Sequence, residues 1–135
     1  MLRLVRLRFR RTLAPLFDRG ARGELIATVW LNWTGFLIWE RNWRTSFGEI
    51  DIIASHGRTL FIIEVKTRSA RSSEFAAPSG AVNEEKLKRL TRLTEAFGRR
   101  RVEAVKRNRI KQIQIVTIEI VEQNLFSYSL RAISN

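Results

Sequence analysis

The chain has 135 residues, 44% of them hydrophobic, which is the size and composition of one globular domain. Its 25 lysines and arginines against 13 acidic residues give a net charge of +12, which favours a polyanionic partner, nucleic acid first and an anionic membrane second. The absence of cysteine excludes disulfides and thiolate chemistry, and a single histidine argues against a histidine-cluster metal site.

The first eleven residues alternate arginine with leucine, valine and phenylalanine and contain no continuous apolar core, so they make a poor secretory signal. We predict that residues 1–19 form a basic, flexible leader and that residues 20–135 form a single domain. The leader is compatible with a nucleic-acid arm, a membrane-surface helix or disorder. The longest apolar stretch, residues 25–39, falls short of the roughly 20 residues that a bilayer span needs. We therefore expect a soluble cytoplasmic protein.

The first half of the domain predicts a helix followed by three strands. From about Gly20 to Trp33 the apolar residues recur at helical spacing, at Leu25, Ile26, Val29, Trp30 and Trp33. Residues 36–41, 49–54 and 59–67 are rich in β-branched and aromatic side chains, and turn residues separate them at 45–48 and 55–58. Short connections of this kind favour an antiparallel meander.

The second half predicts a loop, a helix and two strands. Residues 68–80 have little periodicity and are typical of a loop. Asn83 is a suitable N-cap for a helix whose apolar face contains Leu87, Leu90 and Phe97. Residues 112–122 and 125–133 predict the last strands. Together the elements predict an α/β fold with a mixed central sheet flanked by helices.

Two acids and a lysine interrupt the most apolar strands. Glu64 and Lys66 share one face of their strand, because alternate residues of a strand point the same way. If residues 55–58 close the hairpin, Asp51 lies opposite Ile62 and diagonal to Glu64, within the ~7–8 Å reach of such pairs. Charged side chains inside apolar strands are costly unless they pair or bind a metal, so this placement suggests a site.

Two converging carboxylates in an apolar setting require a cation. A hard divalent ion such as Mg²⁺ or Mn²⁺ prefers oxygen ligands, and Lys66 beside it is suited to hold a water and to balance charge on a phosphate. Such a site fits phosphodiester hydrolysis. The alternative is that Asp51, Glu64 and Lys66 form a salt-bridge ladder on a half-exposed sheet, as surface ion pairs commonly do.

A resemblance to a known family adds to this interpretation. Glu24, Asp51 and the run Glu64-Val65-Lys66, in an αβββαβ order, resemble the PD-(D/E)XK nucleases, which include restriction enzymes and Holliday-junction resolvases. More narrowly, the chain resembles the small YraN family, through matches that span roughly residues 20–97. The matching stretches are Gly23-Glu24, Gly35-Phe36, Arg41-Asn42-Trp43-Arg44, Phe47 to Ala54, Glu64 to Arg68, and Ala81-Val82 with Lys86.

The resemblance implies a restriction endonuclease-like fold and a Mg²⁺- or Mn²⁺-dependent endonuclease. It implies Asp51 and Glu64 as metal ligands, with the Val65 carbonyl completing the inner shell and Glu24 as a further ligand. Lys66 would position the attacking water. Resolvase-like enzymes act as dimers, so a homodimer is a further expectation.

Several basic side chains are candidates for binding nucleic acid, DNA in particular. Trp43 and Arg44 are of the kind that stack on unpaired bases, although a core tryptophan beside a surface arginine is the simpler interpretation. Arg68 follows the acid-bearing strand, and Lys86 matches the family pattern. The remaining candidates form the exposed row of the second helix: Lys88, Arg89 and Arg92.

The leading hypothesis is a metal-dependent nuclease that hydrolyses phosphodiester bonds in DNA, including branched or structured DNA, without a small-molecule cofactor. A second hypothesis is a non-catalytic nucleic-acid-binding module that retains the nuclease fold. A third and weaker one is a membrane-surface protein anchored by its arginine-rich leader.

Overall fold

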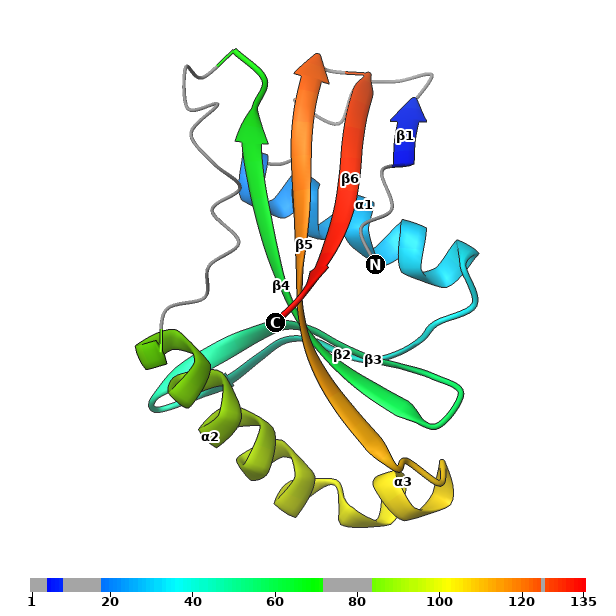
Figure 1. Cartoon of the computed structure of the whole chain (residues 1–135), viewed down its shortest axis with the longest axis vertical. Coiled ribbons are helices and arrows are strands. Elements are labelled where there is room, and N and C mark those ends of the chain that lie inside the picture. The colour runs from blue at the N-terminus through cyan, green and yellow to red at the C-terminus, as the bar shows by residue number, and fades with distance from the viewer. Residues whose placement is uncertain (1–4, 9–17, 72–83, 125) are drawn as a thin grey trace.

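The structure is a computed structural model, which describes residues 5–8, 18–71, 84–124 and 126–135. Its elements in chain order are β1 (Val5–Arg8), α1 (Arg19–Trp33), β2 (Leu37–Thr45), β3 (Gly48–His56), β4 (Thr59–Ser69), α2 (Glu84–Arg100), α3 (Val102–Arg107), β5 (Gln112–Asn124) and β6 (Ser127–Ser134). Figure 1 shows them around one central sheet. The predicted α/β fold, a mixed sheet flanked by helices, is confirmed.

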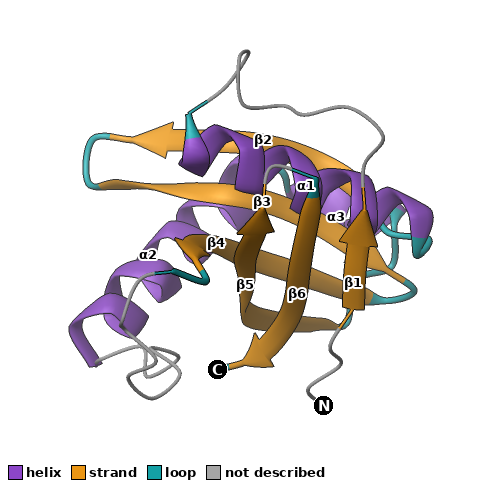
Figure 2. Cartoon of the chain, turned by 90° about the horizontal axis from the view of Figure 1, so that it is seen from above, coloured by secondary structure: helices purple, strands orange, loops and turns teal. Residues whose placement is uncertain are grey.

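The sheet has six strands in the order β1-β6-β5-β4-β3-β2. All neighbours are antiparallel except β4 and β5, which run parallel because α2 and α3 carry the chain across between them. The sheet is strongly twisted, so that β2 and β3 run across the direction of β5 and β6 (Figures 1 and 2). An ion pair between Lys86 of α2 and Glu64 of β4 shows that the acid-bearing face of the meander β2–β3–β4 lies toward α2.

The two long helices cover opposite faces of this sheet. Ile26, Ala27 and Leu31 of α1 join a core with residues of β3, β4, β5 and β6. On the other face α2 packs through Leu90, Leu93 and Phe97 against residues of β3 and β4. The helical pattern of the sequence placed α1 correctly, but Trp33, an expected apolar-face residue, is 81% exposed. The buried face of α1 instead contains Arg22, Gly23, Ile26, Ala27, Thr28 and Leu31.

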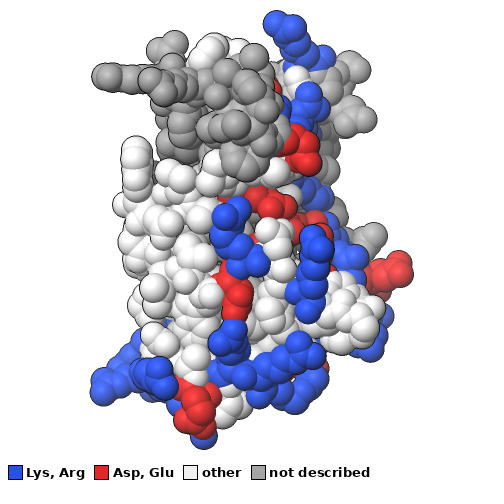
Figure 3. Space-filling model, turned by 180° about the vertical axis from the view of Figure 1, so that it is seen from behind, with Lys and Arg blue, Asp and Glu red and all other residues white. Residues whose placement is uncertain are grey.

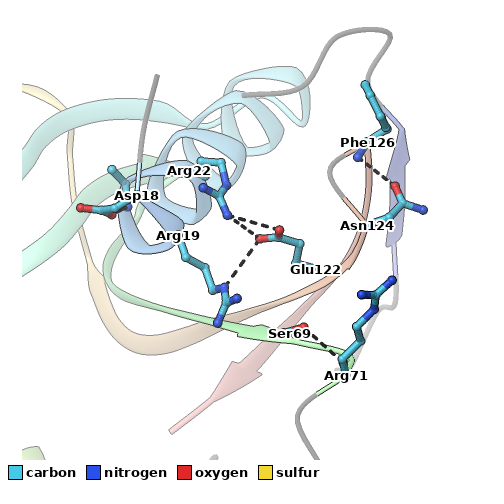
Figure 4. A network of polar contacts seen from close by, with 9 residues as sticks. Asp18, Arg19, Arg22, Ser69, Arg71, Glu122, Asn124 and Phe126 are labelled. Atoms are coloured by element: carbon cyan, nitrogen blue, oxygen red, sulfur yellow. Dashed lines mark hydrogen bonds and ion pairs between the residues drawn. The ribbon is translucent and has the colours of Figure 1, made fainter. Parts of the chain in front are cut away.

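A buried ion pair fastens the first turn of α1 to the sheet (Figure 4). Arg22 donates to both carboxylate oxygens of Glu122 on β5, at 3.0 and 3.2 Å, and Arg19 lies 3.9 Å from the same carboxylate. Arg22 and Glu122 are both buried. Tyr128 lies beside the pair, and burial first, then the charge of Glu122, raise the pKa of its hydroxyl. The contact fixes where α1 crosses the sheet.

The structure also contains two elements that the sequence did not predict. Val5–Arg8, inside the predicted leader, pairs with β6 from Val5 opposite Leu130 to Arg8 opposite Ser127. An alternation of arginine with apolar residues is also the pattern of an edge strand, which explains the difference. The short helix α3 lies between α2 and β5, where no element was predicted.

Some predictions fall on parts of the chain that the structure does not describe. These are the Asn83 cap of α2, residues 72–80 of the predicted loop, and most of the basic leader. Arg68 and Ser69 belong to β4 and not to the loop. None of the described helices has the length and apolar character that crossing a membrane requires.

Candidate active site

The β3–β4 hairpin brings Asp51 and Glu64 together. Ile53 pairs with Ile62 and Ile52 with Ile63, so counting on by one residue places Asp51 directly opposite Glu64. The predicted register, with Asp51 opposite Ile62, was wrong by two residues. Residues 55 and 56 extend β3, and the turn tightens to two residues at Gly57, whose φ of 58° suits glycine. A shift of two residues preserves the face, so the two acids still converge.

The side chain of Asp51 accepts a hydrogen bond from the backbone of the neighbouring strand β4. The backbone N–H of Val65 donates to Asp51 Oδ2 at 2.8 Å. Burial raises the pKa of Asp51 from 3.8 to about 6; the Val65 bond opposes that rise, whereas the charges of Glu24, Glu64 and Glu49 add to it. A pKa near 6 means that this group gives up its proton reluctantly unless a cation comes close.

A lysine of the facing helix α2 forms an ion pair with one oxygen of Glu64. Lys86, in the first turn of α2, forms an ion pair with Glu64 Oε1, and both side chains are about one-fifth exposed. The second oxygen, Oε2, is buried and has no hydrogen-bond partner among the described residues. A buried carboxylate oxygen without a partner is unfavourable, so this atom marks a place where a cation or a donor would be stabilising. Lys86 was predicted to bind nucleic acid, and in the structure it contacts Glu64.

Lys66 lies two residues beyond Glu64 on β4, on the same face by strand alternation, and its partner in the parallel pair is Glu119 of β5. Glu119 is 3% exposed and forms ion pairs with Arg68 and Arg131. Arg68, another predicted nucleic-acid contact, is therefore held by a buried acid. Glu119 was not among the predicted site residues, although an acid between Ile118 and Ile120 gives the same signal that identified Asp51.

Glu24 is half-buried on α1, the helix on the other side of the sheet from α2. It is near enough for its charge to raise the pKa of Asp51. However, the described residues contain no group of three or more histidine, aspartate or glutamate side chains placed to hold a metal ion. The expected role of Glu24 as a ligand stays a prediction.

The donor chemistry at Asp51 and Glu64 fits a hard divalent ion. Two carboxylates meet, one oxygen of Glu64 is buried without a partner among the described residues, and burial, together with the charges of nearby acids, raises the pKa of Asp51. Those are the conditions that a Mg²⁺ or Mn²⁺ ion with oxygen ligands would relieve. The Val65 carbonyl follows Glu64 directly in the chain, so it is a third candidate oxygen.

A hollow of about 210 Å³ opens at these acids. Its described lining is Gly48, Glu49, Ile50, Asp51, Ile63, Glu64, Arg89 and Leu90. A second hollow of about 640 Å³ adjoins it, lined among the described residues by Phe47, Glu85, Lys86, Lys88, Arg89 and Arg92. Arg89 belongs to both, so the acids lie next to a predominantly basic groove.

The other predicted nucleic-acid contacts differ in availability. Lys88, Arg89 and Arg92 are exposed along α2, as expected. Arg44 is exposed but forms an ion pair with Glu49 at 3.1 Å. On the face shown in Figure 3, basic side chains cover much of the right half and the lower edge, with acidic side chains set among them.

Trp43 is not a free stacking surface. Its ring packs edge-to-face on Phe97, with centroids 5.4 Å apart, and the guanidinium of Arg100 lies 5.5 Å from its centroid. It is thus a partly buried member of the core under α2, which was the simpler of the two interpretations.

Comparison with known proteins identifies relatives of the same length class. A protein of Pseudarthrobacter chlorophenolicus, named UPF0102 protein, is 45% identical over 97 residues, which cover 72% of each chain. A UPF0102 protein of Paenarthrobacter aurescens is 40% identical over 78% of this chain and 86% of its own. One of Dictyoglomus turgidum is 37% identical over 76% and 80% respectively.

The family described as Uncharacterised protein family UPF0102 matches residues 23–118, which contain most of α1, the acid-bearing hairpin, α2 and the first half of β5. The match therefore includes Glu24, Asp51, Glu64 and Lys66. The chain belongs to the UPF0102 (YraN) family, a member of the restriction endonuclease-like superfamily.

Proposed function

We propose that this protein is a metal-dependent nuclease that hydrolyses phosphodiester bonds in DNA, with branched or otherwise structured DNA as its substrate class. The observation that carries the proposal is the meeting of Asp51 and Glu64 across the β3–β4 hairpin, with a buried carboxylate oxygen left without a hydrogen bond, beside a basic groove. A net charge of +12 supports a polyanionic substrate.

In this proposal Asp51, Glu64 and the Val65 carbonyl hold the ion, with Glu24 near the site. A bound Mg²⁺ or Mn²⁺ supplies a water of lowered pKa and neutralises charge on the phosphate. Lys66, on the same face as Glu64, orients the attacking water and stabilises negative charge on the phosphate as it is attacked.

Lys86 has a separate part in the proposal. It balances the charge of Glu64 in the metal-free protein, and its ammonium would be released to a substrate phosphate once an ion replaces it. The exposed cations of α2 bind the neighbouring phosphates, which makes binding weaken with added salt.

The test is incubation of the purified protein with Mg²⁺ or Mn²⁺ and matched single-stranded, duplex, flapped and four-way DNA. We expect cleavage that chelator abolishes and that Asp51→Asn and Lys66→Met each reduce by about 100-fold or more. Glu103→Gln, which changes an exposed acid of α3 outside the site, is the control and should cleave normally. Cleavage that is absent, or equally strong in Asp51→Asn, would sink the proposal.

A non-catalytic nucleic-acid-binding module is the second candidate. Specific observations favour it: Glu64 is already paired with Lys86, Asp51 accepts a hydrogen bond from a backbone N–H, and no third acid among the described residues is placed to hold a metal ion with them. Calorimetry with Mn²⁺ separates the candidates. A nuclease binds the ion through Asp51 and loses it in Asp51→Asn, whereas a pure binding module shows the same DNA affinity with and without the ion.

A further inference from the structure

An aromatic side chain at the tip of the β2–β3 hairpin has no part in the chemistry proposed above. Phe47 lies in the turn between the two strands and is 40% exposed. The turn is closed by other groups: the Phe47 N–H donates to Thr45 Oγ at 3.2 Å, and that hydroxyl donates to the Gly48 carbonyl. The ring is therefore not required for the turn, and it remains partly open to solvent.

Phe47 is set among cations. Among the described residues, it lines the larger hollow with four basic residues of α2 and one acid, Glu85. The guanidinium of Arg92 lies 5.3 Å from the centroid of the ring. An aromatic face flanked by arginines and lysines is how proteins bind single-stranded nucleic acid, because bases stack on the ring and cations hold the phosphates.

The hairpin tip is anchored at a fixed place along this groove. A Cβ built on Gly48, the next residue, would lie only 3.2 Å from Leu93 and 3.4 Å from Arg89, so the hairpin backbone rests directly on α2. Arg89 also lines the hollow that contains Asp51 and Glu64. The ring thus lines one of two adjoining hollows, the pair of acids lines the other, and Arg89 lies at both.

The separation suits a short length of nucleic acid. Phe47 precedes Asp51 by four residues of extended chain, roughly 13 Å at about 3.3 Å per residue. A strand that rises about 3.4 Å per nucleotide covers this distance in a few nucleotides. In continuous duplex the base faces are covered by their neighbours, so only an unpaired base offers a face to the ring.

We propose that Phe47 is a stacking platform for an unpaired base, so that the groove along α2 selects nucleic acid with a single-stranded segment over continuous duplex. The inference rests on the proposed function, because it assigns the substrate class of that same site. Phe47 acts here as a specificity residue and takes no part in hydrolysis.

Binding in the presence of EDTA tests this without cleavage. Fluorescence anisotropy would measure the affinity for a labelled single-stranded oligonucleotide and for the matching duplex. We expect Phe47→Ala to weaken single-strand binding by about tenfold or more, since stacking contributes roughly 1–3 kcal/mol per base. Duplex binding should change less than about twofold, and Phe47→Trp should keep single-strand affinity because it preserves the aromatic face.

Trp33→Ala is the matched control, since Trp33 is an exposed aromatic residue at the end of α1, on the other side of the sheet. It should leave both affinities unchanged. Equal loss for single strand and duplex in Phe47→Ala, or no loss for either, would contradict the proposal. So would competition by polyglutamate as strong as that by the oligonucleotide, because it would show binding by charge alone.

These results are separable from the nuclease test. A Phe47-dependent preference for single strands in a protein that cuts nothing supports the stacking platform and overturns the nuclease. Cleavage that depends on Asp51, with single-strand affinity unaffected by Phe47→Ala, supports the nuclease and overturns the stacking platform.

Discussion

At the residue scale, Asp51 shows how opposing contributions set the state of a single group. Burial and three neighbouring acids disfavour its charge, while one backbone N–H favours it, and the balance raises the pKa to about 6. In the unfolded chain the same carboxyl has a pKa near 3.8. Between these values the folded protein binds more protons than the unfolded chain, so folding is favoured by acid at this residue.

The pH dependence of stability follows from this sign. The contribution of Asp51 is fully present below about pH 4 and is lost as the pH rises through about 6. Asp51→Asn removes the ionisable group and can still accept the Val65 hydrogen bond. We expect the variant to gain stability relative to the parent protein between pH 4 and pH 7.5, by about 1 kcal/mol because the group is partly solvated.

Urea unfolding in EDTA at the two pH values measures this change. Glu103→Gln serves as a control, as an exposed acid on α3 should show no such gain. The same stability difference between variant and parent at both pH values would show that burial does not govern Asp51.

At the element scale, the β2–β3 hairpin depends on a glycine where it rests on α2. Gly48 has a φ of 151°, a backbone conformation that residues with a side chain rarely adopt. A Cβ there would also approach Leu93 to 3.2 Å. Backbone conformation and packing therefore both require glycine at this position, which fixes the hairpin against the helix that carries the basic row.

Gly48→Ala should destabilise the protein by about 1–3 kcal/mol, because the strained φ and the close contact add. Gly98→Ala is the counterpart: Gly98 is helical, a Cβ there meets nothing within 4 Å, and alanine should stabilise by about 0.5–1 kcal/mol. Chemical denaturation of both variants tests the pair. Equal effects of the two substitutions would contradict the role of the contact at Gly48.

At the scale of the whole molecule, the buried Arg22–Glu122 pair joins the first helix to the distal strands. Both residues are buried, and 99 residues of chain separate them. Such a pair adds little to stability compared with an apolar equivalent, but losing one member leaves an isolated buried charge. We therefore expect the pair to determine the position of α1 on the sheet more than it increases the stability of the protein.

We expect Glu122→Gln to cost about 3–5 kcal/mol of unfolding free energy, since Arg22 would keep its charge in a buried place. Adding Arg22→Met to that variant should restore part of the loss. A double-mutant cycle by urea denaturation gives the coupling energy. Additive effects of the two substitutions would show that the pair does not act as a unit.

Local sequence patterns predicted the parts of the fold that depend on neighbours in the chain. The helix at 19–33 and the strands β2 to β6 follow from periodicity and turn residues. The shared face of Asp51 and Glu64 was also predictable, because strand alternation survives a register error of two residues. The length of the turn was not, since Ser55 and His56 suit a turn as well as a strand end.

Features that depend on distant contacts could not be predicted in this way. The pairing of Val5–Arg8 with β6 joins the two ends of the chain. The ion pair of Lys86 with Glu64 depends on where α2 crosses the sheet. In each case contacts between distant parts of the chain, and not local secondary-structure propensity, determined the arrangement.

The parallel pairing of β4 with β5 has a consequence for protein synthesis. β4 pairs with β5 along its full length, from Thr59 to Ser69. A chain made from its N-terminus completes β4 well before Gln112–Asn124 has left the ribosome. In that interval the nascent hairpin carries a long strand edge with unsatisfied N–H and C=O groups and apolar side chains, the kind of edge that recruits other strands. The risk of aggregation is therefore highest while the crossover helices are being made.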